Sequence, residues 1–148
     1  MKYSFYLTLF FFFGVTTIMS AQKTVVYTEQ APKAIGPYNQ AVVVGNMLFS
    51  SGQIGLIPET GVFVEGGVKE QTHQVLKNLK AVLEKGGFSL SDIVSCTVFL
   101  KDMNDFPAMN EVYAKYFTSD YPSRATVQVS RLPKDGLVEI NCIAVRAQ

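Results

Sequence analysis

The order of apolar and polar residues after position 22 changes between strand-like and helix-like periods. Three short runs rich in β-branched and aromatic residues, at 23–28, 41–44 and 47–51, predict strands. Gly45-Asn46 separates the second run from the third and predicts a two-residue hairpin loop between them. A longer run at 91–100 is apolar on both alternating sets of positions, which predicts a strand covered on both faces, either within the chain or at an interface.

Two other segments carry apolar residues at helical spacing. Residues 68–85 predict one helix, and Gly86-Gly87 supplies the stop signal that follows it. A second helix is expected to begin near Asn104 or Asp105, because either residue is a good N-cap. The expected apolar faces are Val68, Thr72, Val75, Leu76, Leu79, Val82 and Leu83 in the first helix, and Phe106, Met109, Tyr113, Tyr116 and Phe117 in the second.

Residues 121–145 contain two β-prone runs around a turn-rich middle, and this pattern predicts a second hairpin. Arg124 opens the first run, and Glu139 lies between apolar residues of the second. Both are equally distant from the Arg131–Leu132 midpoint, so an antiparallel fold-back would place them opposite each other. An unpaired charge is costly to bury, and spacing alone favours a structural ion pair. The alternative is an anion-binding site with a carboxylate beside it.

The predicted order of elements is strand, hairpin, helix, strand, helix, hairpin. Such an order is typical of an α+β domain in which two helices pack on one face of a single sheet. The opposite face of that sheet would then have no helix over it. If this face is apolar, a symmetric oligomer is the usual way to cover it.

The first 21 residues have the build of a secretory signal peptide. Lys2 gives a positive start, residues 5–15 form an apolar core too short to span a bilayer, and small residues follow up to Ala21. We expect cleavage after Ala21, with Ser20 as the neighbouring choice, and a mature domain of residues 22–148 in the periplasm or outside the cell. An uncleaved membrane anchor is the alternative.

Charge and composition exclude several classes of site. Of the 13 basic residues one, Lys2, lies in the leader, so the mature chain has 12 basic and 12 acidic residues and no nucleic-acid signature in its net charge. The single histidine, His73, supports neither a metal site nor a histidine-activated nucleophile, and no metal or cofactor is expected. Cys96 and Cys142 lie in β-like runs; an oxidising compartment would permit a disulfide, although buried free thiols are the commoner outcome.

A small set of polar residues remains as candidates for chemistry. Each has an ordinary structural alternative, such as capping a turn, ending a strand, bonding to backbone or forming an ion pair. Only for Arg124 do the residues by themselves favour a functional role. The set is Tyr38, Ser51, Asn110, Arg124, Thr126 and Glu139.

The chain after the leader resembles the RidA/YjgF family of small imine deaminases. The resemblance covers residues 24–146 in order, without large insertions. The matching segments are Ala34-Ile35-Gly36-Pro37-Tyr38, Gly45-Asn46, Ser51-Gly52-Gln53, residues 78–83, 92–94, 98–102 and 104–106, Asn110, Tyr121-Pro122-Ser123-Arg124, residues 131–134, and Val138-Glu139-Ile140.

The resemblance implies a chorismate-mutase-like domain with a single mixed sheet, assembled as a homotrimer with sites between subunits. It also implies cofactor-independent hydrolysis of 2-imino acids and 2-aminoacrylate to 2-oxo acids and ammonia. By position, Arg124 would hold the substrate carboxylate and Glu139 would activate water. Tyr38, Ser51, Asn110 and Thr126 would line the substrate site, with Tyr38 supplied by a neighbouring chain.

The chain departs from the family pattern in two features. Many relatives have cysteine where this chain has Thr126, which argues against a thiol role, and most relatives lack a leader.

A regulatory trimer that binds 2-oxo acids without turnover would use the same residues. A ribonuclease or translation inhibitor is less favoured, because no basic stripe interleaves with aromatic residues.

Overall fold

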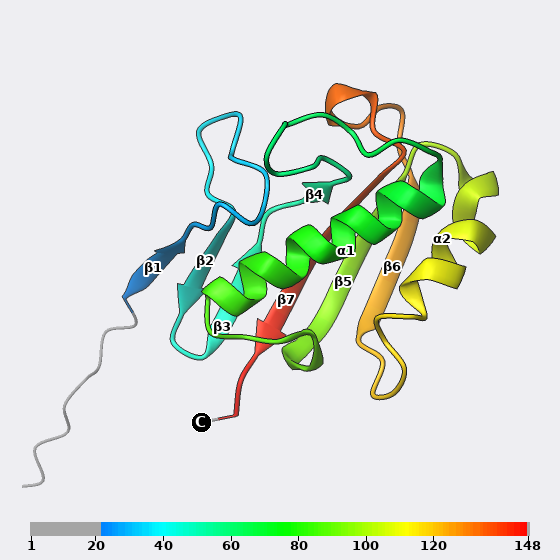
Figure 1. The fold of residues 1–148 in the computed structure, drawn as a ribbon. Helices are drawn as coiled ribbons and strands as arrows, with labels where there is room; N and C mark the ends of the chain where they lie inside the picture. The colour runs from blue at the N-terminus through cyan, green and yellow to red at the C-terminus, as the bar shows by residue number, and fades with distance from the viewer. Residues whose placement is uncertain (1–21, 148) are drawn as a thin grey trace, which may run out of the picture.

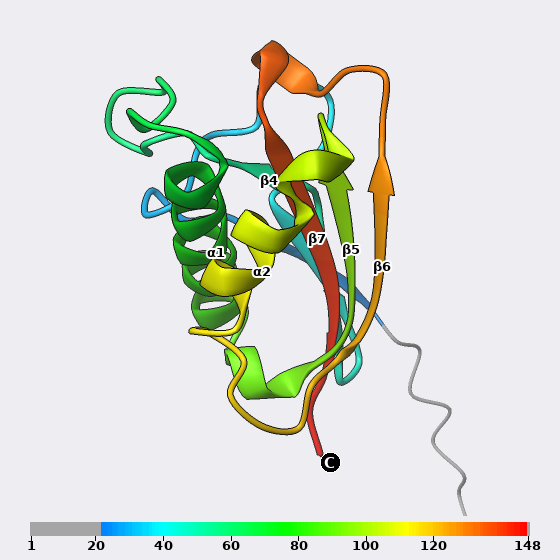
Figure 2. The same ribbon diagram turned by 90° about the vertical axis from the view of Figure 1, so that its right-hand side faces the viewer.

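The computed structural model describes residues 22–147 and shows one mixed sheet with two helices on one of its faces (Figures 1 and 2). The predicted leader, residues 1–21, lies outside the described residues. The sheet order is β1-β2-β3-β7-β5-β6, and β4 also pairs with β7. The strands are β1 Lys23–Val26, β2 Ala41–Val44, β3 Met47–Ser50, β4 Gln53–Ile54, β5 Ile93–Leu100, β6 Ser123–Gln128 and β7 Val138–Val145; the helices are α1 Val68–Lys85 and α2 Phe106–Tyr113.

Helix α1 has the bounds that the apolar spacing predicts. The backbone N–H of Gly67 donates to Glu70 Oε2 at 2.8 Å, which satisfies one of the free amides at the N-terminus. Its apolar stripe packs against the sheet, and the side chains of Leu76, Leu79 and Leu83 are fully buried. Past the C-terminus Gly87 adopts a positive φ of 79°, a conformation that glycine takes without strain.

The Gly45-Asn46 hairpin is confirmed. Strands β2 and β3 pair antiparallel with Val44 opposite Met47, so the loop has two residues. Gly45 has a φ of 59°, in the left-handed region that such short loops require.

The predicted hairpin at 121–145 is wrong. Strand β6 pairs with β5 in parallel, with Arg124 beside Cys96, whereas β7 pairs with the other edge of β5 and is antiparallel to it. Strand β5 therefore lies between the two runs. The reason is helix α2, which returns the chain to the start of β5, so that the next strand must run parallel to it.

Only one face of the sheet is covered in the single chain, so the cover that the sequence predicts for the second face of β5 does not come from within this chain. Cys96, Val98 and Leu100 of β5 are buried under the helices, while Val94 is 47% exposed. Figure 2 shows both helices on the same side of the sheet. The bare face carries partly or fully exposed apolar side chains at positions set by the strand register: Val25, Val42, Phe49, Phe99, Val127 and Ile143.

Candidate functional site

Arg124 points from β6 toward helix α2. Its Cζ lies 4.5 Å from the ring centroid of Tyr113 and 5.7 Å from that of Phe106. Among the described residues no carboxylate lies within ion-pair distance of the guanidinium. The structural ion pair with Glu139, which the sequence spacing favoured, does not exist in this chain.

A cavity of about 390 Å³ opens beside Arg124. Asn110 and Tyr113 line it from helix α2, and Tyr121 and Pro122 line it from the loop that leads into β6. The cavity therefore combines one amide side chain and two phenol rings with a cation that has no anionic partner in the described part of the chain. Such a set suits a small planar anion, because a guanidinium presents two parallel N–H groups to a carboxylate.

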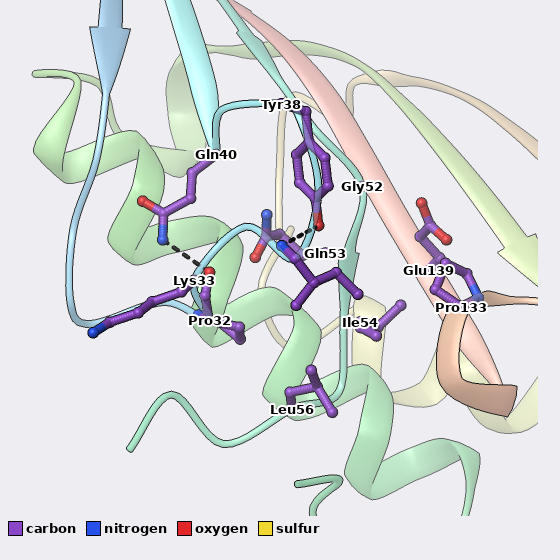
Figure 3. A pocket seen from close by; sticks show the side chains of 11 residues that line it. Pro32, Lys33, Tyr38, Gln40, Gly52, Gln53, Ile54, Leu56, Pro133 and Glu139 are labelled. Atoms are coloured by element: carbon purple, nitrogen blue, oxygen red, sulfur yellow. Dashed lines mark hydrogen bonds between the residues drawn. The ribbon is translucent and has the colours of Figure 1, made fainter. Parts of the chain in front are cut away.

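Glu139 lies in a second pocket, of about 310 Å³ (Figure 3). Burial raises the pKa of its carboxyl above the usual value for glutamate. Gly52 makes room for this side chain: a Cβ built on Gly52 would lie 1.7 Å from Glu139 Oε1. The pocket is lined mainly by apolar groups, and its residues are Pro32, Lys33, Ile35, Tyr38, Gln40, Gly52, Gln53, Ile54, Leu56, Pro133 and Glu139.

Tyr38 stands at the rim of the Glu139 pocket and is 46% exposed. The tight turn at Gly36-Pro37-Tyr38 is closed by the Tyr38 N–H, which donates to Gly36 O at 2.8 Å. The Tyr38 hydroxyl accepts the Ile35 N–H at 3.3 Å (Figure 3). Tyr38 therefore lines the same pocket as Glu139 of its own chain.

The sequence interpretation missed Gln40, which shapes the wall of this pocket. Gln40 is 2% exposed; its Oε1 accepts the Thr28 N–H at 2.7 Å, and its Nε2 donates to Pro32 O at 2.9 Å. A buried amide with these contacts pins the loop 28–40 in place. A glutamine directly before a strand gave the only available signal, and by itself that signal is weak.

Three further predicted residues lie at three separate places in the structure. Asn110 lines the Arg124 cavity. Thr126 lies beside Val98 on β6 and lines neither pocket. Ser51 Oγ donates to Asn39 O at 2.6 Å, and its N–H donates to Gln40 O at 2.9 Å, so Ser51 holds the turn beneath Tyr38.

Arg124 and Glu139 point to opposite faces of the sheet. The neighbour of Arg124 on β5 is Cys96, and the neighbour of Glu139 on β5 is Phe99. Side chains alternate between the two faces along a strand, and Cys96 and Phe99 are an odd number of residues apart. Their side chains, and those of Arg124 and Glu139 beside them, therefore lie on opposite faces. The single chain thus carries two half-sites: an arginine half-site (Arg124, Tyr113, Asn110) and a glutamate half-site (Glu139, Gly52, Tyr38).

Cys96 and Cys142 are direct neighbours across β5 and β7, and both are free and buried. Burial raises the pKa of both thiols, that of Cys142 to about 12. Neither thiol lines a pocket described above. The interpretation as buried free thiols therefore holds in this structure.

The remaining titratable groups give no other site in the described part of the chain. His73 is exposed, and its Nδ1 lies 2.6 Å from the hydroxyl of Tyr116. Within residues 22–147, no three His, Cys, Asp or Glu side chains gather as metal ligands would. The helices of this region are all too short or too polar to span a membrane.

Comparison with known proteins finds one family. Residues 28–146 match the family model described as endoribonuclease L-PSP. A RutC family protein of Pyrococcus horikoshii is 58% identical over 84% of this chain and 98% of the relative. The chloroplastic reactive intermediate deaminase A of Arabidopsis thaliana is 50% identical over 84% of this chain and 67% of the relative. The 2-iminobutanoate/2-iminopropanoate deaminase of Capra hircus is 46% identical over 86% and 93%.

Solved structures have the same fold. A Thermotoga maritima protein assigned as an endoribonuclease superposes with a TM-score of 0.84 at 54% identity, covering 86% of this chain and all of that one. Escherichia coli TdcF, solved with bound serine, gives 0.81 at 46% identity, covering 84% and 99%.

Proposed function

This chain belongs to the endoribonuclease L-PSP family, which is the RidA/YjgF family of the sequence resemblance, and we propose that it is a cofactor-independent imine deaminase. Its substrates would be 2-imino acids, including the imine tautomer of 2-aminoacrylate. The products would be 2-oxo acids and ammonia.

One observation carries the proposal: within residues 22–147 the Arg124 guanidinium has no carboxylate partner, and it faces a cavity. A cation held over aromatic rings keeps its in-plane N–H donors free. These donors can bind the carboxylate that every 2-imino acid carries. A purely structural arginine in such a place would be expected to have an acidic neighbour.

Glu139 supplies the base. Water adds to C2 of the protonated imine while Glu139 takes one of its protons. Transfer of that proton to nitrogen makes ammonia the leaving group. As the C–N bond breaks, Glu139 takes the proton of the new C2 hydroxyl and passes it to the departing ammonia, so that one protonated imino acid and one water give one 2-oxo acid and one ammonium ion. A carboxyl whose pKa is raised by burial is a stronger base than an ordinary glutamate. No covalent catalyst is needed, because a protonated imine is already electrophilic.

The two half-sites would act on one substrate across a subunit boundary. Within one chain they face opposite sides of the sheet, whereas a second copy could bring its arginine half-site to the glutamate half-site of the first. The bare apolar face of the sheet supports such an assembly. We propose the homotrimer that the family resemblance implies.

Turnover is tested with imino acids made in situ by an amino acid oxidase. The purified protein is expected to speed release of ammonia, and Arg124→Ala is expected to lose this effect while the oligomer persists. Full activity of Arg124→Ala would contradict the proposal. Binding of pyruvate that depends on Arg124, without any turnover, would support the regulatory trimer instead.

Mixed oligomers test the shared site. Arg124→Ala and Glu139→Gln chains, each inactive alone, are unfolded and refolded together. If each site takes one half from each of two chains, about one site in four recovers both residues after random mixing. If the halves act within one chain, mixing recovers nothing.

A ribonuclease activity remains the alternative suggested by the family description. Its test is RNA binding at low salt, where contacts to phosphates are strongest. If the protein is a deaminase, we expect no RNA binding, because the mature domain has no excess of positive charge.

A further inference from the structure

Tyr113 occupies a place that packing alone does not explain. It is the last residue of α2 and is 5% exposed, yet it lines the cavity that Arg124 faces. The Arg124 Cζ lies over its ring, 4.5 Å from the centroid. Sequence spacing had placed this tyrosine among the core residues of the helix, and it does belong to the core cluster.

The Tyr113 ring is itself held in a fixed position. Phe117 stacks against it, with ring centroids 4.4 Å apart and an interplanar angle of 24°. Arg124, by contrast, extends from β6, which is the edge strand of the sheet and has β5 as its one neighbour. The rigid element is thus the ring, and the long arginine side chain lies against it.

The hydroxyl of Tyr113 contributes little to this arrangement. It is buried without a hydrogen-bond partner among the described residues. Burial next to the Cys96 thiol raises the Tyr113 pKa, so the phenol stays neutral. The contact with Arg124 is therefore made by the ring and not by a phenolate charge.

A ring is a better support for a substrate-binding arginine than a carboxylate would be. An Asp or Glu partner would occupy the N–H donors and cancel the charge. An aromatic face attracts the cation through its quadrupole and leaves the five N–H groups free.

We propose that Tyr113 is a positioning residue for the reaction, and that its ring orients the Arg124 guanidinium toward the substrate carboxylate. The inference rests on the proposed function, because it assumes that Arg124 binds that carboxylate. It predicts an effect on substrate affinity, with the chemical step left unchanged.

The test compares Tyr113→Leu, which removes the ring, with Tyr113→Phe, which keeps it. Tyr113→Leu is expected to raise KM and to weaken pyruvate binding by roughly three- to tenfold with kcat unchanged, in line with the strength of a cation–π contact. Tyr113→Phe is expected to match the unmodified protein in KM and in pyruvate affinity. Tyr116→Leu is the matched control, since it removes an aromatic ring that does not contact Arg124. If Tyr113→Leu fails to fold, Tyr113→Met fills the same space with a flexible apolar chain.

The outcomes separate this inference from the proposed function. In an Arg124→Lys background, removing the ring should weaken pyruvate binding by a smaller factor than in the unmodified protein, because lysine has no planar group to orient. Unchanged KM and pyruvate affinity in both Tyr113→Leu and Tyr113→Met, with Arg124→Ala still inactive, would overturn the positioning role alone. A Tyr113→Phe defect as large as that of Tyr113→Leu would also overturn it. Full activity of Arg124→Ala would overturn both.

Discussion

The arginine half-site and the glutamate half-site solve opposite electrostatic problems. Arg124 keeps a full charge available to a ligand because it lies over aromatic rings instead of beside an anion. Glu139 sits in a mainly apolar pocket, where burial makes it hold a proton more strongly. The first arrangement suits binding of a charged group, and the second suits proton transfer. Changes in the two halves should therefore affect different kinetic constants.

The largest effect is expected from Glu139→Gln. Loss of the base should lower kcat by roughly 10²–10⁴-fold, the usual contribution of general acid–base catalysis, with little change in pyruvate affinity. Steady-state kinetics with oxidase-generated imines and titration with pyruvate check both constants. If pyruvate binding and kcat fall by the same factor, the assignment of binding to one half-site and proton transfer to the other is wrong.

Arg124→Ala should lose turnover because it no longer binds the substrate carboxylate. Losing a bidentate, charge-assisted contact is expected to weaken pyruvate binding by about 10- to 100-fold. Calorimetric titration measures this, with Lys77→Ala as a control that removes an exposed cation of helix α1 outside the lining of the Arg124 cavity. Equal effects of the two substitutions would indicate a general electrostatic effect and not a specific contact.

Gly52→Ala should harm only the glutamate half-site. The added methyl group would occupy the position of the Glu139 carboxylate, so the side chain must move. We expect kcat to fall by about tenfold, since small misplacements of a catalytic group are costly. The control is Ala125→Gly, on the exposed surface of β6. Gly61→Ala would not serve, because Gly61 has a positive φ. Normal kcat in Gly52→Ala would show that the carboxylate position is not critical.

The raised pKa of Glu139 predicts a pH dependence. The base works only when ionised, so kcat/KM should fall on acidification at a pH above the ordinary glutamate range. The same shift means that the folded state favours the protonated form. Glu139→Gln should thus raise the melting temperature at neutral pH, and the gain should shrink as the pH falls through the raised pKa. A pH-independent gain would point to packing as its cause.

The smallest effect is expected at the thiols. Both have raised pKa values and are buried, so neither should react quickly with a thiol reagent while the protein is folded. Labelling with and without denaturant should show slow and fast reaction respectively. Rapid labelling of the native protein would show that the strand pair opens readily.

Local pattern determined much of this protein. The apolar spacing gave the bounds of α1, Gly45-Asn46 gave the first hairpin, and the absence of metal-ligand spacing directed attention to Arg124 and Glu139. The helix and the hairpin each depend on residues within a few positions of one another. Helical periodicity and turn geometry act over that range, and for this reason they can be recognised without a structure.

Only the tertiary structure decided which strands are neighbours and which way their side chains face. The residues of β6 and β7 are equally suited to pair with each other or with β5. The choice came from the crossover through α2, and it placed Arg124 and Glu139 on opposite faces. It also placed the Tyr113 ring against Arg124, and it placed Gly52 against Glu139, which is far from Gly52 in the chain. Strand pairing is a non-local choice, because a strand's sequence specifies an alternating surface and not the partner that covers it.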